Sequence, residues 1–265
     1  MQSASFARAL ELLSGPPLFD GCRLRYLDLG TNSGGRVESM YADLSQPPGR
    51  WEKLFAGWNR SEVCTVGFEP NPKHTTRLLD LEAELRRRGH RVTILSAAVS
   101  DKNGTADFYS DQDKAHQEWG SSLWQWNNRM GKSHSSKVPM FELDWFLRYH
   151  LGQASQDGVP DGAPLHGTLT LMKFDAEIAE YGALPPAIHS GSLCSTVDMV
   201  QLEQHAHLLK KMVKQGQLLN GRPAEEEETK RLQSTLLDAV QLARKLHSVG
   251  KCPTVIESMS IWGTR

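Results

Sequence analysis

Two features of this chain, a glycine-containing turn and a single acid, are suited to binding a nucleoside. The turn, residues 28–34, follows a short apolar run and contains Gly30 and Gly34. Glycine lets the backbone approach a ligand closely, and a helix that starts after such a turn directs its free N–H groups at the ligand. Glu69 follows a second apolar run, where an acid can accept hydrogen bonds from both hydroxyls of a ribose. Together the turn and Glu69 predict a site for a nucleoside-type cofactor.

A dinucleotide is the main competing ligand for such a turn. Its phosphate-binding fingerprint requires glycine at positions 30, 32 and 35, but position 32 is occupied by Asn32. This departure weakens a pyrophosphate cradle, so the turn is better suited to a ligand without phosphates.

Acids and a histidine after two later apolar runs are candidates for accepting a proton. Asp175, Glu177 and His205 lie at such positions and are the candidate catalytic residues. Structural roles stay open, because Asp175 can orient a cofactor and His205 can form a hydrogen bond at a helix start. Glu203 can pair with Lys173 and hold the shape of the site. Asp175, Glu177 and Glu203 can also bind a divalent cation, but their spacing matches no dedicated metal-binding loop, so no metal site is predicted.

Alternating strands and helices are expected to position these residues. Strands are expected at residues 24–29, 63–68, 91–99, 105–109, 168–174, 197–202 and 254–262. Helices are expected at residues 3–14, from 36, from 71 with an end at 89, around 208–213, and from the acidic run 225–228 to about 246. The β-α-β-α-β alternation of the first half implies a parallel sheet covered by helices, with ligands bound beyond the carboxyl ends of the strands.

The length and charge of the chain limit the classes of protein to which it can belong. Its 265 residues are enough for one large α/β domain, residues 1–265, with inserts near 45–60, 110–137 and 153–167. The 30 Lys and Arg residues are balanced by 31 Asp and Glu residues, which gives no reason to expect a nucleic-acid partner. No apolar run approaches the ~18 residues needed to span a bilayer, so no membrane span is expected.

The four cysteines predict a reducing environment. They are Cys22, Cys64, Cys194 and Cys252, and none forms a Cys-x-x-Cys pair. This scatter fits reduced thiols better than a disulfide framework or a zinc site. We therefore expect a cytoplasmic protein.

The insert near residues 110–137 is predicted to form a long loop over the site, because it is polar and rich in Trp, Ser, Asn and Gly. Its candidate contacts to a substrate are Ser121, Ser122 and Trp124, close in sequence to Trp119 and Trp126. Packing of the tryptophan rings in the core is the alternative.

Four sequence motifs, in the same order, resemble those of the FkbM-type methyltransferase family. Residues 26–34, Tyr-Leu-Asp-Leu-Gly-Thr-Asn-Ser-Gly, are similar to the family's Asp-Val-Gly-Ala-Asn-x-Gly loop. Residues 67–72, Gly-Phe-Glu-Pro-Asn-Pro, resemble its Glu-Pro-x-Pro. Residues 97–104 resemble its Ala-x-Ser-Asp-x-x-Gly turn, and residues 171–180 resemble its Lys-Ile-Asp-Val-Glu-Gly-Ala-Glu. The resemblance runs from about Tyr26 to His205.

The resemblance implies S-adenosylmethionine as cofactor and methylation of an oxygen on a small-molecule or glycan-like acceptor as the reaction. It implies that loop 28–34 surrounds the amino-acid part of the cofactor, that Glu69 binds its ribose, and that Ala97 and Ala98 lie against its adenine. The cofactor-binding residues it implies are Asp28, Gly30, Thr31, Asn32, Gly34, Glu69, Pro70, Ala97 and Ala98. By analogy with class I methyltransferases it implies a Rossmann-like, three-layer α/β/α sandwich with a mainly parallel seven-stranded sheet, whose last strand, near 254–262, is antiparallel.

One residue departs from the family pattern. Where the family has Gly between two acids of its last motif, this chain has Ile178, so the backbone is expected to approach a ligand less closely there. Two other function classes stay open. One is an inactive cofactor-binding relative that uses the Trp-rich loop as a contact surface, and the other is a nicotinamide-dependent oxidoreductase.

Overall fold

The computed structural model describes residues 2–41, 62–110, 121–123, 135–152, 168–214, 218–219 and 222–258. The inserts predicted near 45–60 and 153–167 lie outside these residues, as do Trp119, Trp124 and Trp126.

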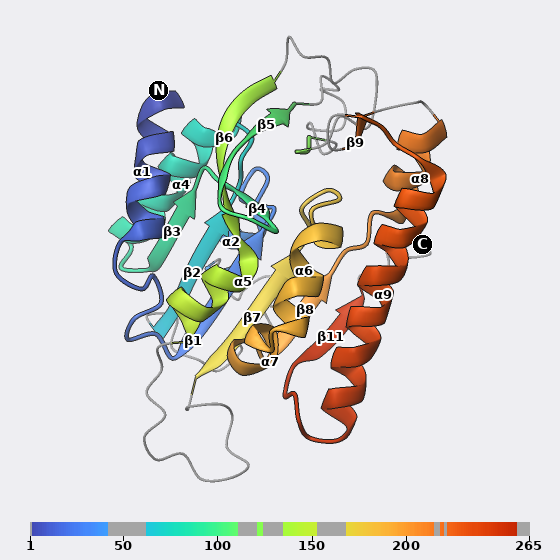
Figure 1. Ribbon diagram of the computed structural model, residues 1–265. Coiled ribbons are helices and arrows are strands. Elements are labelled where there is room, and N and C mark those ends of the chain that lie inside the picture. Colours follow the sequence, from blue (N-terminus) through green and yellow to red (C-terminus); the bar gives the residue numbers. More distant parts are fainter. Residues whose placement is uncertain are drawn as a thin grey trace, which may run out of the picture.

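A six-stranded sheet with the order β11-β8-β7-β1-β2-β3 forms the centre of the fold (Figure 1). Its strands are β1 Leu24–Leu29, β2 Val63–Phe68, β3 Arg91–Leu95, β7 Leu169–Phe174, β8 Met199–Leu202 and β11 Val255–Ser258. Every neighbouring pair in it is parallel. All residues of β1 and β2 are buried, as expected for strands covered on both faces.

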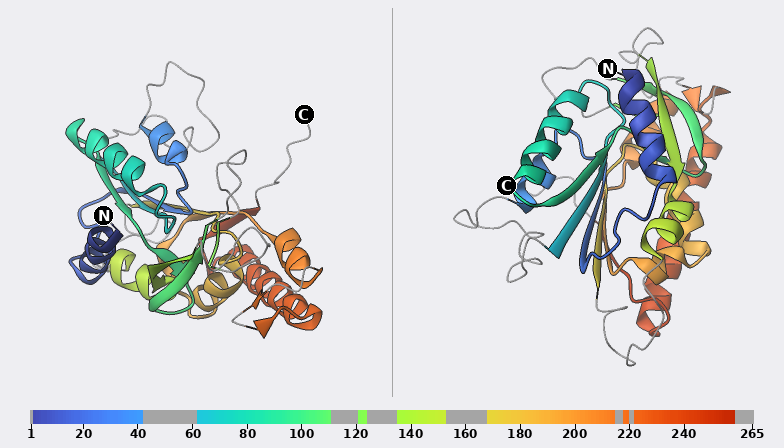
Figure 2. Two further views of the ribbon diagram at one scale, coloured as in Figure 1. Left: turned by 90° about the horizontal axis from the view of Figure 1, so that it is seen from above. Right: turned by 90° about the vertical axis from the view of Figure 1, so that its left-hand side faces the viewer.

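Helices cover both faces of the sheet, which gives three layers (Figure 2). On one face lie α2 Gly35–Met40 and α4 Thr75–Arg87, and the apolar cluster beneath them includes Val37, Leu78 and Leu85. On the other face lie α1 Gln2–Ser14, α5 Leu143–Phe146, α6 Glu180–His189, α7 Ser192–Thr196, α8 Ala206–Lys214 and α9 Glu226–Ser248. Their apolar residues form the larger cluster with the strands. The predicted alternation of strands and helices is confirmed.

A second, smaller sheet receives part of the predicted third strand. Its order is β4-β6-β5, formed by Ala98–Ser100, Ser135–Glu142 and Gly104–Tyr109. The expected strand 91–99 is therefore two strands in two sheets, because the chain leaves the central sheet after Leu95. Three short segments complete the described elements: a π-helical turn at Leu147–Leu151, and β9 Leu218–Leu219 paired with β10 Arg222–Pro223.

The last strand differs from the prediction. β11 is parallel to β8, and the described central sheet has six strands, so the expected seven strands with an antiparallel last strand are wrong. The reason is the connection between β8 and β11, which contains α8 and the 23-residue α9. A helical crossover returns the chain to the end of the sheet where the previous strand began, so the next strand runs parallel.

The cysteines also differ from the prediction. Cys22 is bonded to Cys64 and Cys194 to Cys252, and the described residues include no free cysteine. The expectation of reduced thiols is therefore wrong. Spacing along the chain did not reveal the pairs, because each pair joins segments that only the folded sheet brings together. No helix in the described part of the chain is long and apolar enough to cross a membrane.

The Cys194–Cys252 disulfide closes a long loop, since its cysteines are separated by 58 residues. Such a crosslink reduces the entropy of the unfolded chain and contributes roughly 2–5 kcal/mol to stability. We predict that the Cys194→Ala/Cys252→Ala variant unfolds at a temperature lower by about 5–15 °C. Thermal unfolding without reductant, followed by circular dichroism, measures this shift against disulfide-bonded wild-type protein under the same conditions. An unchanged midpoint would show that the crosslink does not contribute.

Candidate functional site

The carboxyl ends of β2, β1, β7 and β8 lie side by side along one edge of the sheet (Figure 1). In register, Asp28 of β1 lies between Gly67 of β2 and Lys173 of β7. Glu69, Asp175 and Glu203 directly follow their strands at the same edge. The structure thus brings together the strand-end acids that the sequence analysis singled out.

The two glycines of the β1 loop are explained by contacts within the protein. Gly30 has a φ of +87°, and a Cβ there would lie 1.8 Å from the carbonyl oxygen of Asp175. Gly34 has a φ of +89°, and a Cβ there would lie 2.5 Å from Cδ2 of Leu81 on α4. Packing against the Asp175 backbone therefore requires glycine at position 30, and the left-handed backbone conformation favours glycine at position 34. Their presence does not by itself indicate a ligand.

Glu69 joins the β1 loop to the segment that follows β2. Its Oε2 accepts a hydrogen bond of 2.7 Å from the backbone N–H of Asn32, and its Oε1 accepts one of 2.8 Å from the backbone N–H of Asn71. Burial raises the pKa of Glu69 to about 7, although both N–H groups oppose that rise. Each carboxylate oxygen has a second lone pair, so Glu69 can still accept a hydrogen bond from a ligand hydroxyl.

A buried lysine lies between two acids of neighbouring strands. Nζ of Lys173 lies 3.2 Å from Oδ1 of Asp28 and 3.1 Å from Oδ2 of Asp175, and it donates a hydrogen bond of 2.8 Å to the carbonyl oxygen of Gly30. Asp28 is fully buried, burial raises its pKa, and its Oδ2 has no hydrogen-bond partner within the described residues. The sequence analysis allowed Lys173 to pair with Glu203. In the structure Lys173 instead pairs with Asp28 of β1 and Asp175 after β7.

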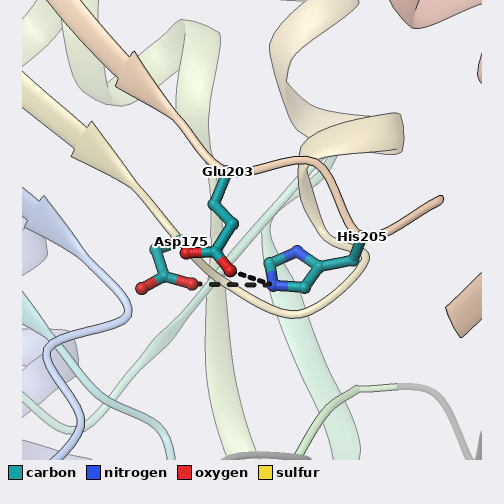
Figure 3. Close-up of side chains that lie close together, drawn as sticks. All are labelled: Asp175, Glu203 and His205. Atoms are coloured by element: carbon teal, nitrogen blue, oxygen red, sulfur yellow. Dashed lines mark ion pairs between the residues drawn. The ribbon is translucent and has the colours of Figure 1, made fainter. Parts of the chain in front are cut away.

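His205 is surrounded by carboxylates (Figure 3). Its Nε2 lies 3.6 Å from an oxygen of Asp175, 3.6 Å from one of Glu177 and 3.7 Å from one of Glu203. On the other side of the ring, Glu180 accepts hydrogen bonds from Nδ1 at 3.0 Å and from the backbone N–H of His205 at 2.8 Å. The three predicted catalytic residues are therefore neighbours in space.

The charges of this cluster decide which of its members can accept a proton. Burial opposes a charge on His205, but the carboxylates of Glu180, Glu177 and Asp175 outweigh it and raise the pKa of the ring to about 10. Burial raises the pKa of Glu177 to about 8. At neutral pH His205 is therefore a cation and Glu177 is mostly protonated, so neither can accept a proton. Asp175 remains the candidate, and Glu177 becomes one only above its pKa.

Glu180 is a site residue that the sequence analysis did not assign. It is fully buried at the start of α6, and it fixes the orientation of the His205 ring. The sequence contained a signal for the role of Glu180, since this residue is the last acid of the motif 171–180. An acid at a helix start is common, however, and the partner of Glu180, His205, lies on another loop. The role was therefore not recognised.

Ile178 adopts the backbone conformation that glycine would favour. Its φ is +75°, Glu177 before it has a φ of +23°, and the Ile178 side chain is fully buried. A β-branched residue with a positive φ is an outlier that costs of order 1–3 kcal/mol. The loop between β7 and α6 thus keeps a glycine-type turn without the glycine.

The described part of the second insert lies against the site. The hydroxyl of Ser122 donates a hydrogen bond of 2.8 Å to the carbonyl oxygen of Glu177, and the Asn71 amide donates one of 3.3 Å to the hydroxyl of Ser121. These serines therefore connect the loops that follow β2 and β7. Trp124, the third predicted substrate contact, lies outside the described residues.

The remaining predicted cofactor residues differ in how exposed they are. Ala97 and Ala98 are 0% and 3% exposed within apolar clusters, and Thr31 is buried, whereas Pro70 is half-buried. The hydroxyl of Thr31 donates a hydrogen bond of 3.1 Å to the carbonyl oxygen of Asp28, which stabilises the turn. Ala97 and Ala98 are thus packed against apolar residues of the protein itself.

Comparisons of the chain with protein-family models, curated proteins and solved structures found no match.

The strain at Ile178 leads to a comparison of two substitutions. Ile178→Ala and Ile178→Gly both remove the buried side chain, but only glycine relieves the positive φ. We predict that Ile178→Gly is more stable than Ile178→Ala by about 1 kcal/mol. Ala183→Gly, in the interior of α6, is the control and is expected to lower stability. Chemical denaturation measures both, and an Ile178→Ala variant that is the more stable of the two would contradict the strained turn.

The Lys173 contacts lead to a double-mutant cycle. Lys173→Met leaves buried Asp28 without its cation, which is expected to cost roughly 3–5 kcal/mol. Adding Asp28→Asn removes the unpaired charge, so we predict that the double variant is more stable than Lys173→Met alone. Denaturation at neutral pH tests this, and strictly additive losses would show that the two groups do not interact.

Proposed function

We propose that this chain is an S-adenosylmethionine-dependent methyltransferase of the FkbM type that methylates an oxygen of a small-molecule or glycan-like acceptor. The observation that carries the proposal is the contact between Glu69 and the backbone N–H of Asn32. It joins the β1 loop and the acid after β2, the two features from which a nucleoside site was predicted. Both lie at the carboxyl edge of a parallel sheet, where ligands of such folds bind.

The residues at this edge fit the cofactor chemically. Oδ2 of Asp28 is a buried acceptor without a hydrogen-bond partner among the described residues, which suits the ammonium group of an amino acid. Glu69 has lone pairs for ribose hydroxyls. The full set proposed to hold the cofactor is Asp28, Gly30, Thr31, Asn32, Gly34, Glu69, Pro70, Ala97 and Ala98.

The residues after β7 and β8 fit the second part of the reaction. When bound, the cofactor supplies an activated methyl group on sulfur. The acceptor hydroxyl must lose its proton as its oxygen gains the methyl group, and Asp175, or Glu177 in its ionised form at a pH above about 8, is proposed to accept that proton. Their side chains are 30% and 21% exposed, so an acceptor can reach them. Ser121 and Ser122, which contact the loops after β2 and β7, are proposed to face the acceptor.

The disulfides weaken the basis of the predicted cytoplasmic location. That prediction rested on reduced thiols, whereas disulfides are typical of proteins in oxidising compartments. A cytoplasmic location therefore stays a prediction without support from the cysteines.

Incubation with methyl-labelled cofactor and an extract of small metabolites and glycans tests the activity. The proposal expects label in an acceptor, and thermal stabilisation by S-adenosylhomocysteine. Stabilisation without transfer to any acceptor would favour an inactive cofactor-binding module. Stabilisation by a nicotinamide dinucleotide alone would favour an oxidoreductase.

Glu69 provides the sharpest test of the cofactor site. We predict that Glu69→Ala weakens binding of S-adenosylhomocysteine about tenfold or more, because the hydrogen bonds from the ribose hydroxyls to the Glu69 carboxyl oxygens are lost. Calorimetric titration measures the affinity. Glu38→Ala is the matched control, since Glu38 is an exposed acid on α2 beside the same loop. Wild-type affinity in a folded Glu69→Ala variant would contradict the ribose assignment.

A further inference from the structure

Three possible metal ligands converge beyond β7 and β8. One carboxylate oxygen each of Asp175 and Glu203 and one ring nitrogen of His205 all lie within 4.8 Å of one another. Figure 3 shows these side chains pointing toward a common centre from two neighbouring loops. The sequence analysis predicted no metal site because it considered spacing along the chain, and the two loops are far apart in sequence.

The orientation of His205 is the second observation that indicates a cation. The ring is 3% exposed, and Glu180 accepts the hydrogen bond of Nδ1, so Nε2 is directed into the cluster. Within the described residues Nε2 forms no hydrogen bond, and the nearest carboxylate oxygens lie 3.6–3.7 Å away. A histidine that binds a metal through one nitrogen commonly donates its other N–H to a carboxylate in this way.

The spacing fits ligands that share one ion. With metal–ligand distances of about 2.1 Å, two ligands of an octahedral ion lie about 3.0 Å apart when adjacent and about 4.2 Å apart when opposite. The distances from Nε2 to the oxygens of Asp175 and Glu203 are 3.6 and 3.7 Å and lie between these two values, so small rotations of the side chains would bring the three atoms to one ion. They exceed the length of a hydrogen bond.

The cluster also contains more acids than cations. Asp175, Glu177, Glu180 and Glu203 all lie close to His205, and Lys173 is the lysine in contact with Asp175. Within the described part of the chain, Lys173 is already shared with Asp28. Buried carboxylates in excess require either bound protons or a bound cation.

We propose that Asp175, Glu203 and His205 bind one divalent cation of the Mn²⁺ type, which replaces the proton that Nε2 of His205 carries without the ion and releases it to water. Carboxylate oxygens suit Mn²⁺, and the single imidazole is compatible with it. Asp175 and Glu203 are 30% and 22% exposed, which leaves room for water to complete the coordination. Glu180 is the positioning residue that directs Nε2 toward the ion.

Electron paramagnetic resonance with Mn²⁺ alone tests the proposal on the full chain. We expect saturable uptake of one Mn²⁺ per chain, seen as loss of the six-line signal of the free ion. Asp175→Asn and Glu203→Gln should each weaken this uptake at least about tenfold. The matched controls are Asp107→Asn and Glu84→Gln, which change exposed acids with ion pairs elsewhere and should leave uptake unchanged.

A second measurement uses only the wild-type protein and therefore does not require any variant to fold. Echo modulation of bound Mn²⁺ in the wild-type protein should show coupling to one ¹⁴N nucleus, that of His205. Absence of saturable uptake at millimolar Mn²⁺, absence of nitrogen coupling, or equal uptake by Asp175→Asn and Asp107→Asn would each overturn the proposal. In those cases the protonated ring of His205 is the cation that compensates the negative charge of the surrounding carboxylates.

The metal site and the methyltransferase activity can fail separately. Mn²⁺ uptake is measured without cofactor, and S-adenosylhomocysteine binding is measured without metal. Cofactor binding without Mn²⁺ uptake would overturn the metal site alone. Mn²⁺ uptake without cofactor binding would overturn the methyltransferase proposal and leave the metal site standing.

Discussion

The buried amine of Lys173 is the contact on which the arrangement of the site depends. It lies between Asp28 at the end of β1 and Asp175 after β7, and it also donates to the carbonyl oxygen of Gly30. A buried carboxylate is costly unless it is paired, so this one cation allows two acids to stand at the centre of the sheet edge. The close packing of Gly30 against the Asp175 backbone also holds the loop after β1 against the loop after β7.

The edge divides into two regions with different chemistry. Around β1 and β2, the Glu69 carboxylate accepts hydrogen bonds from two backbone N–H groups and keeps lone pairs for the hydroxyls of a neutral sugar. Around β7 and β8, the carboxylates near His205 form a strongly negative region that suits a proton or a metal ion. Lys173 and Asp175 lie between the two. A bound cofactor and a reacting acceptor would therefore meet near Asp175.

Local signals in the sequence were sufficient for the strands of the central sheet. They were insufficient for β6, whose first residues were expected to lie in a loop, and for contacts between distant segments. Apolar runs placed β1 and β2 correctly, because strands buried on both faces contain few polar residues. The direction of β11 was wrong because it was taken from an analogy, whereas the long helix α9 determines it. The disulfides and the Glu180–His205 hydrogen bond were missed because their partners lie on separate segments. The positive φ of Ile178 contradicts the preference of its own residue type, so no propensity could have predicted it.

Hydrogen–deuterium exchange with and without S-adenosylhomocysteine tests the central claim most directly. The claim is that the loop after β1 and the segment after β2 contact one adenosine-containing ligand. It predicts slower amide exchange in peptides that cover residues 28–34 and 69–71, with no change in the exposed final turns of α9. Unchanged exchange in both peptides at saturating ligand, or slowing confined to another part of the chain, would contradict it.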